Sequence, residues 1–282
     1  MHPIEGPAPA LIDIKDPVAQ LLRDLIHEKT GVFCEAERLS SLIERLQPLA
    51  GAIACRSYLD YFYFLKYDDA QGEELKRVLD AISVQETFFW RESDQIKALT
   101  AKVLPAWVQS NPRPLRVWSA ACASGEEPYS LAIAAEEAGY EKQVEIVATD
   151  ASRLALAAAR RGIYRERSFR VIPPHLKDAY FRQEEGGYAI RRDILSRVRF
   201  DWANLVGLTG SEAPGVNVIF CRNVFIYFSH ASIQKVLASF ARMLPAGGHL
   251  FTGASESLFN LTKQFDLQDL GGAFAYVRNS RT

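Results

Sequence analysis

Two adjacent carboxylates and a single glycine stand where the sequence predicts a turn between a strand and a helix. In the segment 116–130, RVWSAACASGEEPYS, a short apolar run is followed by small residues, Gly125, and then Glu126 and Glu127. A dinucleotide site at such a turn uses G-x-G-x-x-G, because bare backbone must approach two phosphates at the positive end of a helix. Two carboxylates suit that helix end but repel phosphate and attract a cation. The segment therefore favours S-adenosylmethionine, an adenosine that carries an ammonium and a sulfonium and no phosphate.

Three acidic residues around this turn are candidates for holding such a ligand. Glu126 is the candidate partner of the ammonium group, although the helix dipole alone also stabilises a carboxylate in the first turn. Glu127 is expected to be structural or to point elsewhere. Asp150 ends a second apolar run, 25 residues after Gly125, where an acidic side chain can accept the ribose hydroxyls. The alternative for Asp150 is a cap on the helix expected to begin at Ser152.

The segment FCRNVFIYF, residues 220–228, is a second place with candidate functional groups. Arg222 and Asn223 follow an apolar run, where a parallel sheet opens onto its ligand. Tyr227 is a candidate for contacting cofactor or substrate, and its alternative is a core aromatic residue.

A third candidate segment is SVQETFFWRES, residues 83–93, in which polar residues alternate with aromatic ones. One interpretation is an arm that folds over the ligand and brings Arg91 to it. The other is a packed hinge between two domains.

The spacing of apolar residues predicts two domains of different class. Over residues 13–82, apolar residues recur every three or four positions, as in packed amphipathic helices, the first capped by Asp16 and Pro17. Residues 83–100 form a linker. From 101 to 282, strand-like and helical runs alternate, which predicts an α/β domain with a doubly wound, mostly parallel sheet. Its expected strands are 116–120, 144–150, 217–224, 249–255 and 274–278.

The alternation breaks between about residues 163 and 200. There AYFRQ, YAIRR and RVRF, with the turn EEGG, predict a small antiparallel β-subdomain inserted in the larger domain.

Composition excludes several classes of protein. A net charge of -1 gives no basic excess for nucleic acid, and 48% hydrophobic residues is ordinary for a globular protein. No apolar run approaches about 18 residues and no signal peptide is evident, so a cytoplasmic protein is expected. The four cysteines form no C-x-x-C pair and the five histidines no cluster, so no metal site is predicted.

Together these motifs resemble the chemotaxis receptor methyltransferases (CheR), a family of bacterial S-adenosylmethionine-dependent protein-glutamate O-methyltransferases. The resemblance rests on ETFFWRE, SAACASGEEPYS, ATDAS, RGIY and FCRNVFIYF and covers nearly the whole chain. It implies a small N-terminal all-α domain and a Rossmann-like methyltransferase domain bearing the β-subdomain. Arg91 and Tyr227 would be catalytic, nearest the transferred methyl group. The implied cofactor contacts are Gln85, Thr87, Arg91, Glu126, Asp150, Asn204, Leu205, Arg222 and Asn223, with Gln85 standing where the family commonly has Asn.

The resemblance also implies the partner, which is the cytoplasmic helical region of chemoreceptors whose signalling is tuned by methylation. Some members grip a receptor tail with a longer, Gly-rich turn in the β-subdomain, whereas the turn 184–187 is short. Binding of a receptor C-terminal tail is therefore not expected. Helix 35–49 offers Arg38 and Arg45 against three glutamates, which differs from the arginine-rich docking helix of many members.

Methylation of a glutamate carboxylate needs no general base, because a glutamate side chain, with an ordinary pKa of about 4.3, is already ionised at neutral pH. The sequence shows no cluster of candidate catalytic residues around a histidine, which agrees with this expectation. Three other functions compete with this one: a methyltransferase for nitrogen or nucleic acid, a non-catalytic adaptor, and an NAD-dependent reductase. The missing phosphate-binding glycines make the reductase the weakest of them.

Overall fold

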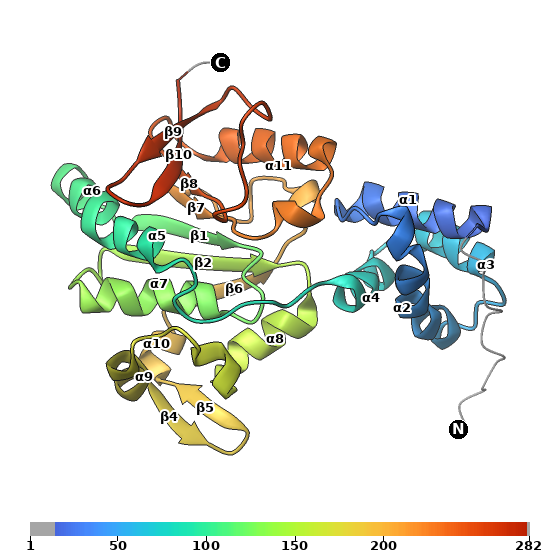
Figure 1. Ribbon diagram of the computed structural model, residues 1–282, viewed down its shortest axis with the longest axis horizontal. Coiled ribbons are helices and arrows are strands. Elements are labelled where there is room, and N and C mark those ends of the chain that lie inside the picture. Colours follow the sequence, from blue (N-terminus) through green and yellow to red (C-terminus); the bar gives the residue numbers. More distant parts are fainter. Residues whose placement is uncertain (1–14, 281–282) are drawn as a thin grey trace. The chain divides into compact units, whose positions relative to one another are not determined.

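The computed structural model describes residues 15–280, and the first two residues of the predicted helical domain, 13 and 14, lie outside them. Its contacts divide the chain into two compact units (Figure 1). The helical unit contains the chain up to Val84 together with Tyr227–Ser229, and the catalytic unit contains Gln85–Ile226 and the chain from His230. Among the described residues, no helix is long and apolar enough to cross a membrane.

The helical unit is a bundle of short helices around one apolar core. As the sequence predicted, Asp16 caps the first helix by accepting a hydrogen bond from the Val18 amide, and Pro17 begins it. Gly31 ends the helix with a φ of 78°. Five of its core residues, Leu22, Leu46, Tyr61, Leu65 and Val78, are each at most 2% exposed. The four helices are α1 (Pro17–Thr30), α2 (Leu39–Ala52), α3 (Tyr58–Tyr63) and α4 (Glu73–Ile82).

The catalytic unit is built on a seven-stranded sheet of order β6-β2-β1-β7-β8-β10-β9. The first five strands in this order are parallel to their neighbours, and β10 is antiparallel to both β8 and β9. A mostly parallel, doubly wound sheet is thus confirmed. The strands are β1 (Leu115–Ala120), β2 (Val144–Asp150), β6 (Val198–Trp202), β7 (Val218–Phe220), β8 (His249–Phe251), β9 (Phe265–Asp269) and β10 (Phe274–Arg278).

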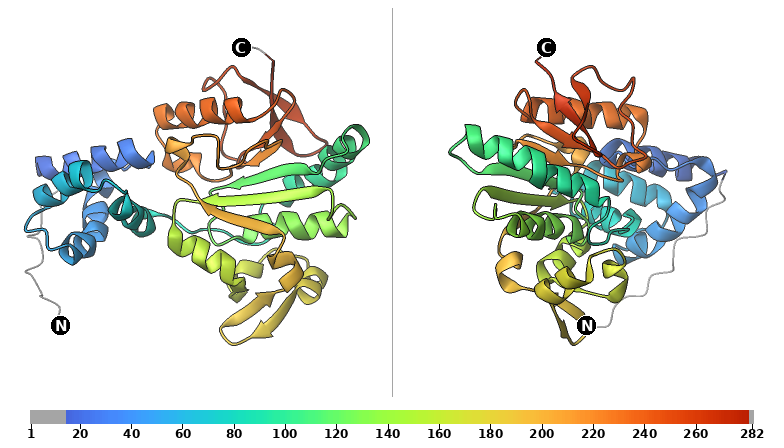
Figure 2. Two further views of the ribbon diagram at one scale, coloured as in Figure 1. Left: turned by 180° about the vertical axis from the view of Figure 1, so that it is seen from behind. Right: turned by 60° about the vertical axis from the view of Figure 1, so that its left-hand side comes forward.

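Helices cover both faces of this sheet (Figures 1 and 2). Trp118 of β1 is fully buried and packs edge-on against Phe240 of α11. On the other face, Tyr129 of α7 packs against Phe200 of β6. Because strand side chains alternate between faces, these contacts hold α7 and α11 on opposite sides. The helices are α5 (Ser93–Ala98), α6 (Leu104–Ser110), α7 (Glu126–Glu137), α8 (Arg153–Arg161) and α11 (His230–Met243).

The small antiparallel sheet is present, but one of its strands differs from the prediction. It has three strands in the order β3-β5-β4, and RVRF is not one of them. That segment is β6, which pairs in parallel with β2, so that Val198 lies opposite Ile146 and Trp202 opposite Asp150. β6 is thus an edge strand of the main sheet. The subdomain elements are β3 (Ile163–Tyr164), α9 (Pro174–Tyr180), β4 (Phe181–Glu184), β5 (Gly187–Ile190) and α10 (Arg192–Leu195).

Candidate functional site

The candidate site lies at the carboxyl ends of the parallel strands, around β1 and β7. Ser119 of β1 pairs with Phe220 of β7 at the middle of the sheet. From β1 the chain builds the sheet outward through β2 to β6, and it then returns to add β7 on the other side of β1. Ligands of open α/β sheets bind at such a reversal of strand order, so β1 and β7 present their ends to the place where a cofactor is expected.

The turn after β1 has an unusual backbone. Ala121, Ala123 and Gly125 have φ angles of 61°, 48° and 94°, and two of the three are alanines in a region that L-residues seldom adopt. Hydrogen bonds hold the turn: the Cys122 amide donates to the Thr149 carbonyl at 2.9 Å. Strained backbone held in this way is typical of ligand-binding turns.

Asp150 fixes this turn to the end of β2. Its Oδ2 accepts from the Ala123 amide and its Oδ1 from the Ser152 amide, both at 2.8 Å, and the side chain is 7% exposed. The N-cap of α8 is Ser152, whose Oγ accepts from the Ala155 amide, while Asp150 also holds the start of that helix through the Ser152 amide. The role of Asp150 toward a cofactor stays a prediction.

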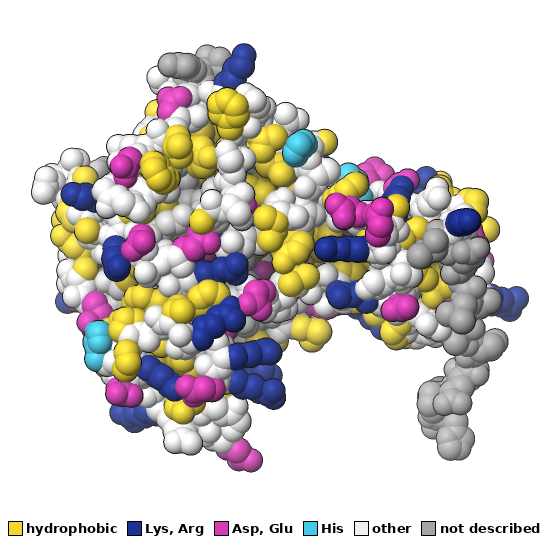
Figure 3. All heavy atoms as spheres, in the orientation of Figure 1, with side chains coloured by type: hydrophobic (Ala, Val, Ile, Leu, Met, Phe, Trp, Pro, Cys, Tyr) yellow, Lys and Arg dark blue, Asp and Glu magenta, His cyan; other side chains and the backbone are white. Residues whose placement is uncertain are grey.

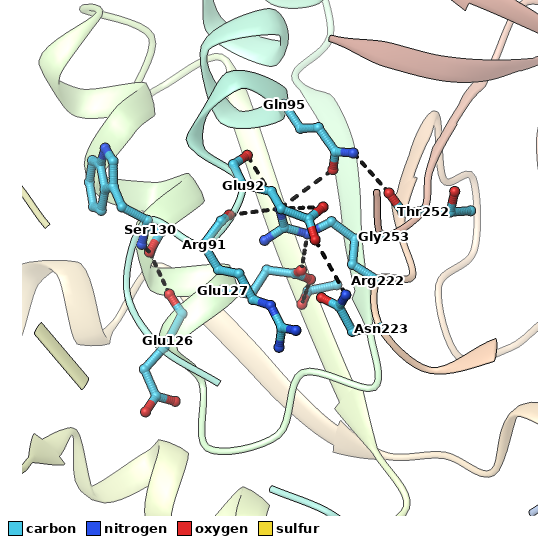
Figure 4. A network of polar contacts seen from close by, with 12 residues as sticks. Arg91, Glu92, Gln95, Glu126, Glu127, Ser130, Arg222, Asn223, Thr252 and Gly253 are labelled. Carbon is cyan, nitrogen blue, oxygen red and sulfur yellow. Dashed lines mark hydrogen bonds and ion pairs between the residues drawn. The ribbon is translucent and has the colours of Figure 1, made fainter. Parts of the chain in front are cut away.

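The two carboxylates at the start of α7 point in different directions (Figure 4). Glu126 is 3% exposed, and its oxygens accept hydrogen bonds from the hydroxyls of Ser124 at 2.7 Å and Ser168 at 3.0 Å. Burial raises the pKa of Glu126, although these hydroxyls act in the opposite direction. Glu126 is therefore a buried carboxylate with hydroxyl partners beside the turn.

Glu127 instead forms a buried ion pair with Arg222. The two side chains are 12% and 2% exposed, and the Arg222 Nε lies 2.6 Å from the Glu127 Oε2. The other oxygen of Glu127 accepts from the Ser119 hydroxyl at 2.6 Å. Sequence reasoning expected Glu127 to be structural, and these contacts agree with that expectation.

Arg222 joins three segments of the chain. Besides pairing with Glu127, its Nη1 donates to the Arg91 carbonyl at 2.8 Å and lies 3.4 Å from the Gln95 Oε1 (Figure 4). The Gln95 Nε2 in turn donates to the Thr252 carbonyl just after β8. The sequence predicted Arg222 as a cofactor contact, and the structure adds a clamp between β7, α7 and the start of α5.

The segment before α5, residues 85–92, is fixed to the catalytic unit by its aromatic residues. Phe89 is fully buried against Tyr164, Phe169 and Phe181, and its amide donates to the Ser168 carbonyl at 2.9 Å. We call this segment the strap. Its aromatic residues therefore serve as an anchor.

Arg91 lies at the end of the strap, between two residues of positive φ, Trp90 at 62° and Glu92 at 51°. Its Nη1 donates to the Glu86 carbonyl at 2.7 Å, and its guanidinium lies 5.4 Å from the centre of the Phe88 ring. The Arg91 side chain is thus held by contacts with other residues of the strap.

The remaining predicted cofactor contacts divide between the strap and the end of β6. On the strap, Gln85 is exposed and Thr87 half-buried. After β6, Asn204 accepts from the Val206 amide at 3.2 Å, and Leu205 is 6% exposed.

Tyr227 belongs to the helical unit, where its carbonyl accepts from the Phe33 amide at 2.7 Å. The other predicted site residues are all in the catalytic unit. The catalytic role of Tyr227 stays a prediction.

Sequence reasoning missed Glu256. This side chain is 7% exposed and follows β8, and its two oxygens accept hydrogen bonds from backbone amides on both sides of the site. The signal that could have found it is a glutamate in the small-residue loop TGASES, directly after a buried strand.

The residues at these strand ends fit S-adenosylmethionine better than a nucleotide with phosphates. Two buried carboxylates, Glu126 and Asp150, flank the turn, and each is held in place by hydrogen bonds from hydroxyls or amides. Such groups can accept from an ammonium and from ribose hydroxyls, whereas they oppose phosphate. Within residues 15–280, no three His, Cys, Asp or Glu side chains are grouped so that they could hold a metal ion.

Comparison with known proteins points to one family over both units. Residues 85–272 match the CheR methyltransferase, SAM binding domain, and residues 19–83 match the CheR methyltransferase, all-alpha domain. The chain is 35% identical over 262 residues to chemotaxis protein methyltransferase 2 of Vibrio cholerae, with 91% of each chain covered. It is 37% identical over 268 residues to chemotaxis protein methyltransferase 1 of Pseudomonas aeruginosa, covering 91% of this chain and 96% of that one. A chemotaxis protein methyltransferase of Borreliella burgdorferi is 29% identical over 253 residues.

Proposed function

The chain belongs to the CheR methyltransferase family, and we propose that it transfers a methyl group from S-adenosylmethionine to glutamate side chains of chemoreceptors. The product on the receptor is a glutamyl methyl ester, which changes the charge of the receptor and tunes its signalling. The observation that carries the proposal is the pair of buried carboxylates, Glu126 and Asp150, on either side of the turn after β1.

When bound, S-adenosylmethionine would supply an electrophilic methyl group on its sulfonium, with S-adenosylhomocysteine as the product. The proposed roles of the chain are to bind, to orient and to exclude water. Glu126 would pair with the ammonium group and Asp150 with the ribose hydroxyls. Gln85, Thr87, Asn204, Leu205, Arg222 and Asn223 complete the proposed set of cofactor contacts.

Arg91 is the proposed residue for orienting the acceptor carboxylate, and Tyr227 for shaping the path of the methyl group. An arginine too close to the acceptor would stabilise the ionised carboxylate and slow its attack. The hydrogen bond from Arg91 to the Glu86 carbonyl and its position near the Phe88 ring support a held guanidinium that guides the acceptor. Well-oriented reactants can gain effective molarities of about 10⁵–10⁸ M. Holding the acceptor carboxylate in line with the methyl group can therefore supply much of the rate acceleration.

We infer that the functional division of the chain is a helical domain 13–82, a linker 83–100 and a methyltransferase domain 101–282. The linker works with the methyltransferase domain, because Phe89 anchors the strap there. The partner is the cytoplasmic helical region of a chemoreceptor, and the protein acts in the cytoplasm without gripping a receptor tail. Lys and Arg side chains gather where Figure 1 places α8 and the β-subdomain (Figure 3), which supports an acidic partner surface there.

The test is transfer of labelled methyl from S-adenosylmethionine to a cytoplasmic fragment of a chemoreceptor. We expect label on the receptor that alkali releases as methanol, because carboxyl methyl esters hydrolyse at high pH. Label that survives alkali would indicate methylation of nitrogen. No base-labile label on any receptor offered would overturn the proposal in favour of a cofactor-binding or receptor-binding adaptor.

A further inference from the structure

Glu256 accepts hydrogen bonds from four backbone amides, and none of the roles described above uses it. Its Oε2 accepts from the amides of Asn223 at 2.7 Å and Gly253 at 2.6 Å. Its Oε1 accepts from the amides of Phe225 at 2.7 Å and Ile226 at 3.4 Å. One buried carboxylate therefore holds the loop after β7 to the loop after β8.

The loop after β7 needs such a partner because of its backbone. Asn223 has a φ of 59°, in the left-handed region that is unfavourable for most residues with a Cβ and that Asn adopts more readily than most. Directly before it, Arg222 makes the clamp to Glu127 and the strap. In this conformation the amides of Asn223 and Phe225 both donate to Glu256, so the carboxylate stabilises it.

Gly253 shows how closely the two loops approach each other. A Cβ added at Gly253 would lie 2.6 Å from the Asn223 Nδ2, 2.8 Å from the Glu256 Oε2 and 2.9 Å from the Asn223 amide nitrogen. Gly253 and Asn223 lie together beside Arg222 in Figure 4. A side chain at position 253 would therefore push apart the same groups that Glu256 holds together.

An ionised carboxylate suits this place, because it is an acceptor with about four lone-pair positions and no donor. A glutamine has the same length, but its NH₂ group would face backbone amides that also donate. Whichever oxygen the NH₂ group replaced, two of the four backbone amides would lose their acceptor. The charge also strengthens each hydrogen bond beyond that of a neutral acceptor.

We propose that Glu256 is a positioning residue of the methyl-donor site, which it acts on by fixing Arg222 and Asn223. The proposal rests on the proposed function, since it takes these two residues as cofactor contacts. Glu256 does not touch the cofactor in this account. Its removal should weaken cofactor binding through the loop after β7.

The experiment compares Glu256→Gln with Glu212→Gln in the full chain. Glu212 is a matched control, because its carboxylate also accepts from backbone amides, those of Thr209 and Gly210, in a loop before β7. Binding of S-adenosylmethionine is measured by calorimetry, the KM for cofactor and for receptor by methyl transfer, and folding by thermal unfolding. We expect Glu256→Gln to raise the Kd and KM for the cofactor about tenfold, equivalent to about 1.4 kcal/mol, with the KM for receptor unchanged. Glu212→Gln should leave both cofactor constants within about twofold of wild type.

A second pair of variants covers the case in which Glu256→Gln does not fold. Gly253→Ala keeps the carboxylate and disturbs its partners, and Gly51→Ala is its control, since a Cβ at Gly51 meets nothing within 4 Å. Gly253→Ala should weaken cofactor binding, and Gly51→Ala should not. Cofactor affinity equal to wild type in a folded Glu256→Gln or Gly253→Ala protein would overturn the inference, as would an equal loss in the controls. Failure of the wild-type protein to bind S-adenosylmethionine would instead overturn the proposed function.

Discussion

At the scale of single residues, the neighbouring carboxylates Glu126 and Glu127 have different environments although they are adjacent in sequence. Successive helix residues are about 100° apart around the axis, so one carboxylate lies among the hydroxyls of Ser124 and Ser168 and the other on Arg222. Among residues 15–280, Glu127 is ion-paired and Glu126 is not, so Glu126 can bind an ammonium group without first breaking an ion pair. Two testable differences between these residues follow.

The first prediction concerns Glu126 and pH. Burial raises the pKa of this carboxyl above its ordinary value, and only the ionised form attracts the ammonium group. Affinity for S-adenosylmethionine should therefore fall as the pH falls through the raised pKa, at a higher pH than for an exposed glutamate. Glu126→Gln should bind about tenfold or more weakly at neutral pH, a loss of about 1.4 kcal/mol. Calorimetric titrations between pH 5 and 8 check both, and a variant with the same pH dependence as wild type would contradict the assignment.

The second prediction concerns stability. Glu127→Ala removes the nearer of two carboxylates from the Arg222 guanidinium, which is 2% exposed, and leaves the Glu92 Oε2 at 3.8 Å. Breaking a buried pair costs about 3–5 kcal/mol, and the second carboxylate places the expected loss at the low end of that range. Glu145→Ala is the control, because Glu145 pairs with Arg116 where both side chains are about half exposed, and such a pair contributes about 0–1 kcal/mol. Urea unfolding measures both free energies. Equal small losses would show that the Glu127–Arg222 pair does not stabilise the fold.

The sequence could predict Asp150 and Glu126, because their places follow from the spacing of strand, turn and helix. It could not predict Glu256, whose partners Asn223 and Phe225 are about 30 residues away in another loop. Nor could it show that Arg222 is a clamp, since that depends on which of two adjacent glutamates faces β7.

At the scale of elements, the turn after β1 decides the shape of the site. Its single glycine, Gly125, was visible in the sequence, but the positive φ angles of Ala121 and Ala123 were not, because alanine has no preference for that region. Their conformation follows from tertiary hydrogen bonds such as that between the Ala123 amide and Asp150.

A substitution in this turn separates backbone strain from crowding. Gly125→Ala adds a Cβ at a φ of 94° and 2.9 Å from the Ala159 Cβ, whereas Gly139→Ala adds one at 75° with nothing within 4 Å. Both variants lose about 1–2 kcal/mol from the left-handed conformation. Gly125→Ala should lose about 1–3 kcal/mol more, because overpacking adds its own cost. Denaturant unfolding measures the free energy of unfolding of both variants. Equal losses would show that the turn relaxes around the added Cβ, so that crowding against Ala159 has no cost.

The strap is the second element that shapes the proposed site, because it places Arg91. Arg91→Ala removes the guanidinium and leaves the buried anchor Phe89 in place, so folding should change little. Loss of one oriented charged group at a reacting centre costs about 10²–10³ in turnover, and we expect a loss of that order in kcat. Arg116→Ala, at the other end of β1, should retain wild-type kcat. Steady-state methyl transfer measures both, and unchanged turnover in Arg91→Ala would remove it from the mechanism.

At the scale of the whole molecule, the predicted fold class held because it rests on long, repeated patterns. Strands β1, β2 and β10 lie within a few residues of their predicted bounds, whereas β7 and β8 each end four residues earlier than predicted. The strands that were missed or misassigned are at the sheet edges. β9 was not predicted because four of its five residues are exposed, and β6 was assigned to the subdomain because alternating polarity fits an edge strand of either sheet.

The central claim is that this chain makes methyl esters on receptor glutamates, and tandem mass spectrometry tests it most directly. A chemoreceptor cytoplasmic fragment is incubated with the protein and S-adenosylmethionine, digested, and sequenced before and after treatment with alkali. We expect peptides that carry one added methyl group on a glutamate side chain. Alkali should remove this methyl group, and it should be absent when that glutamate is replaced by alanine. Methyl groups on lysine or arginine that persist in alkali, or receptor peptides of unchanged mass, would contradict it.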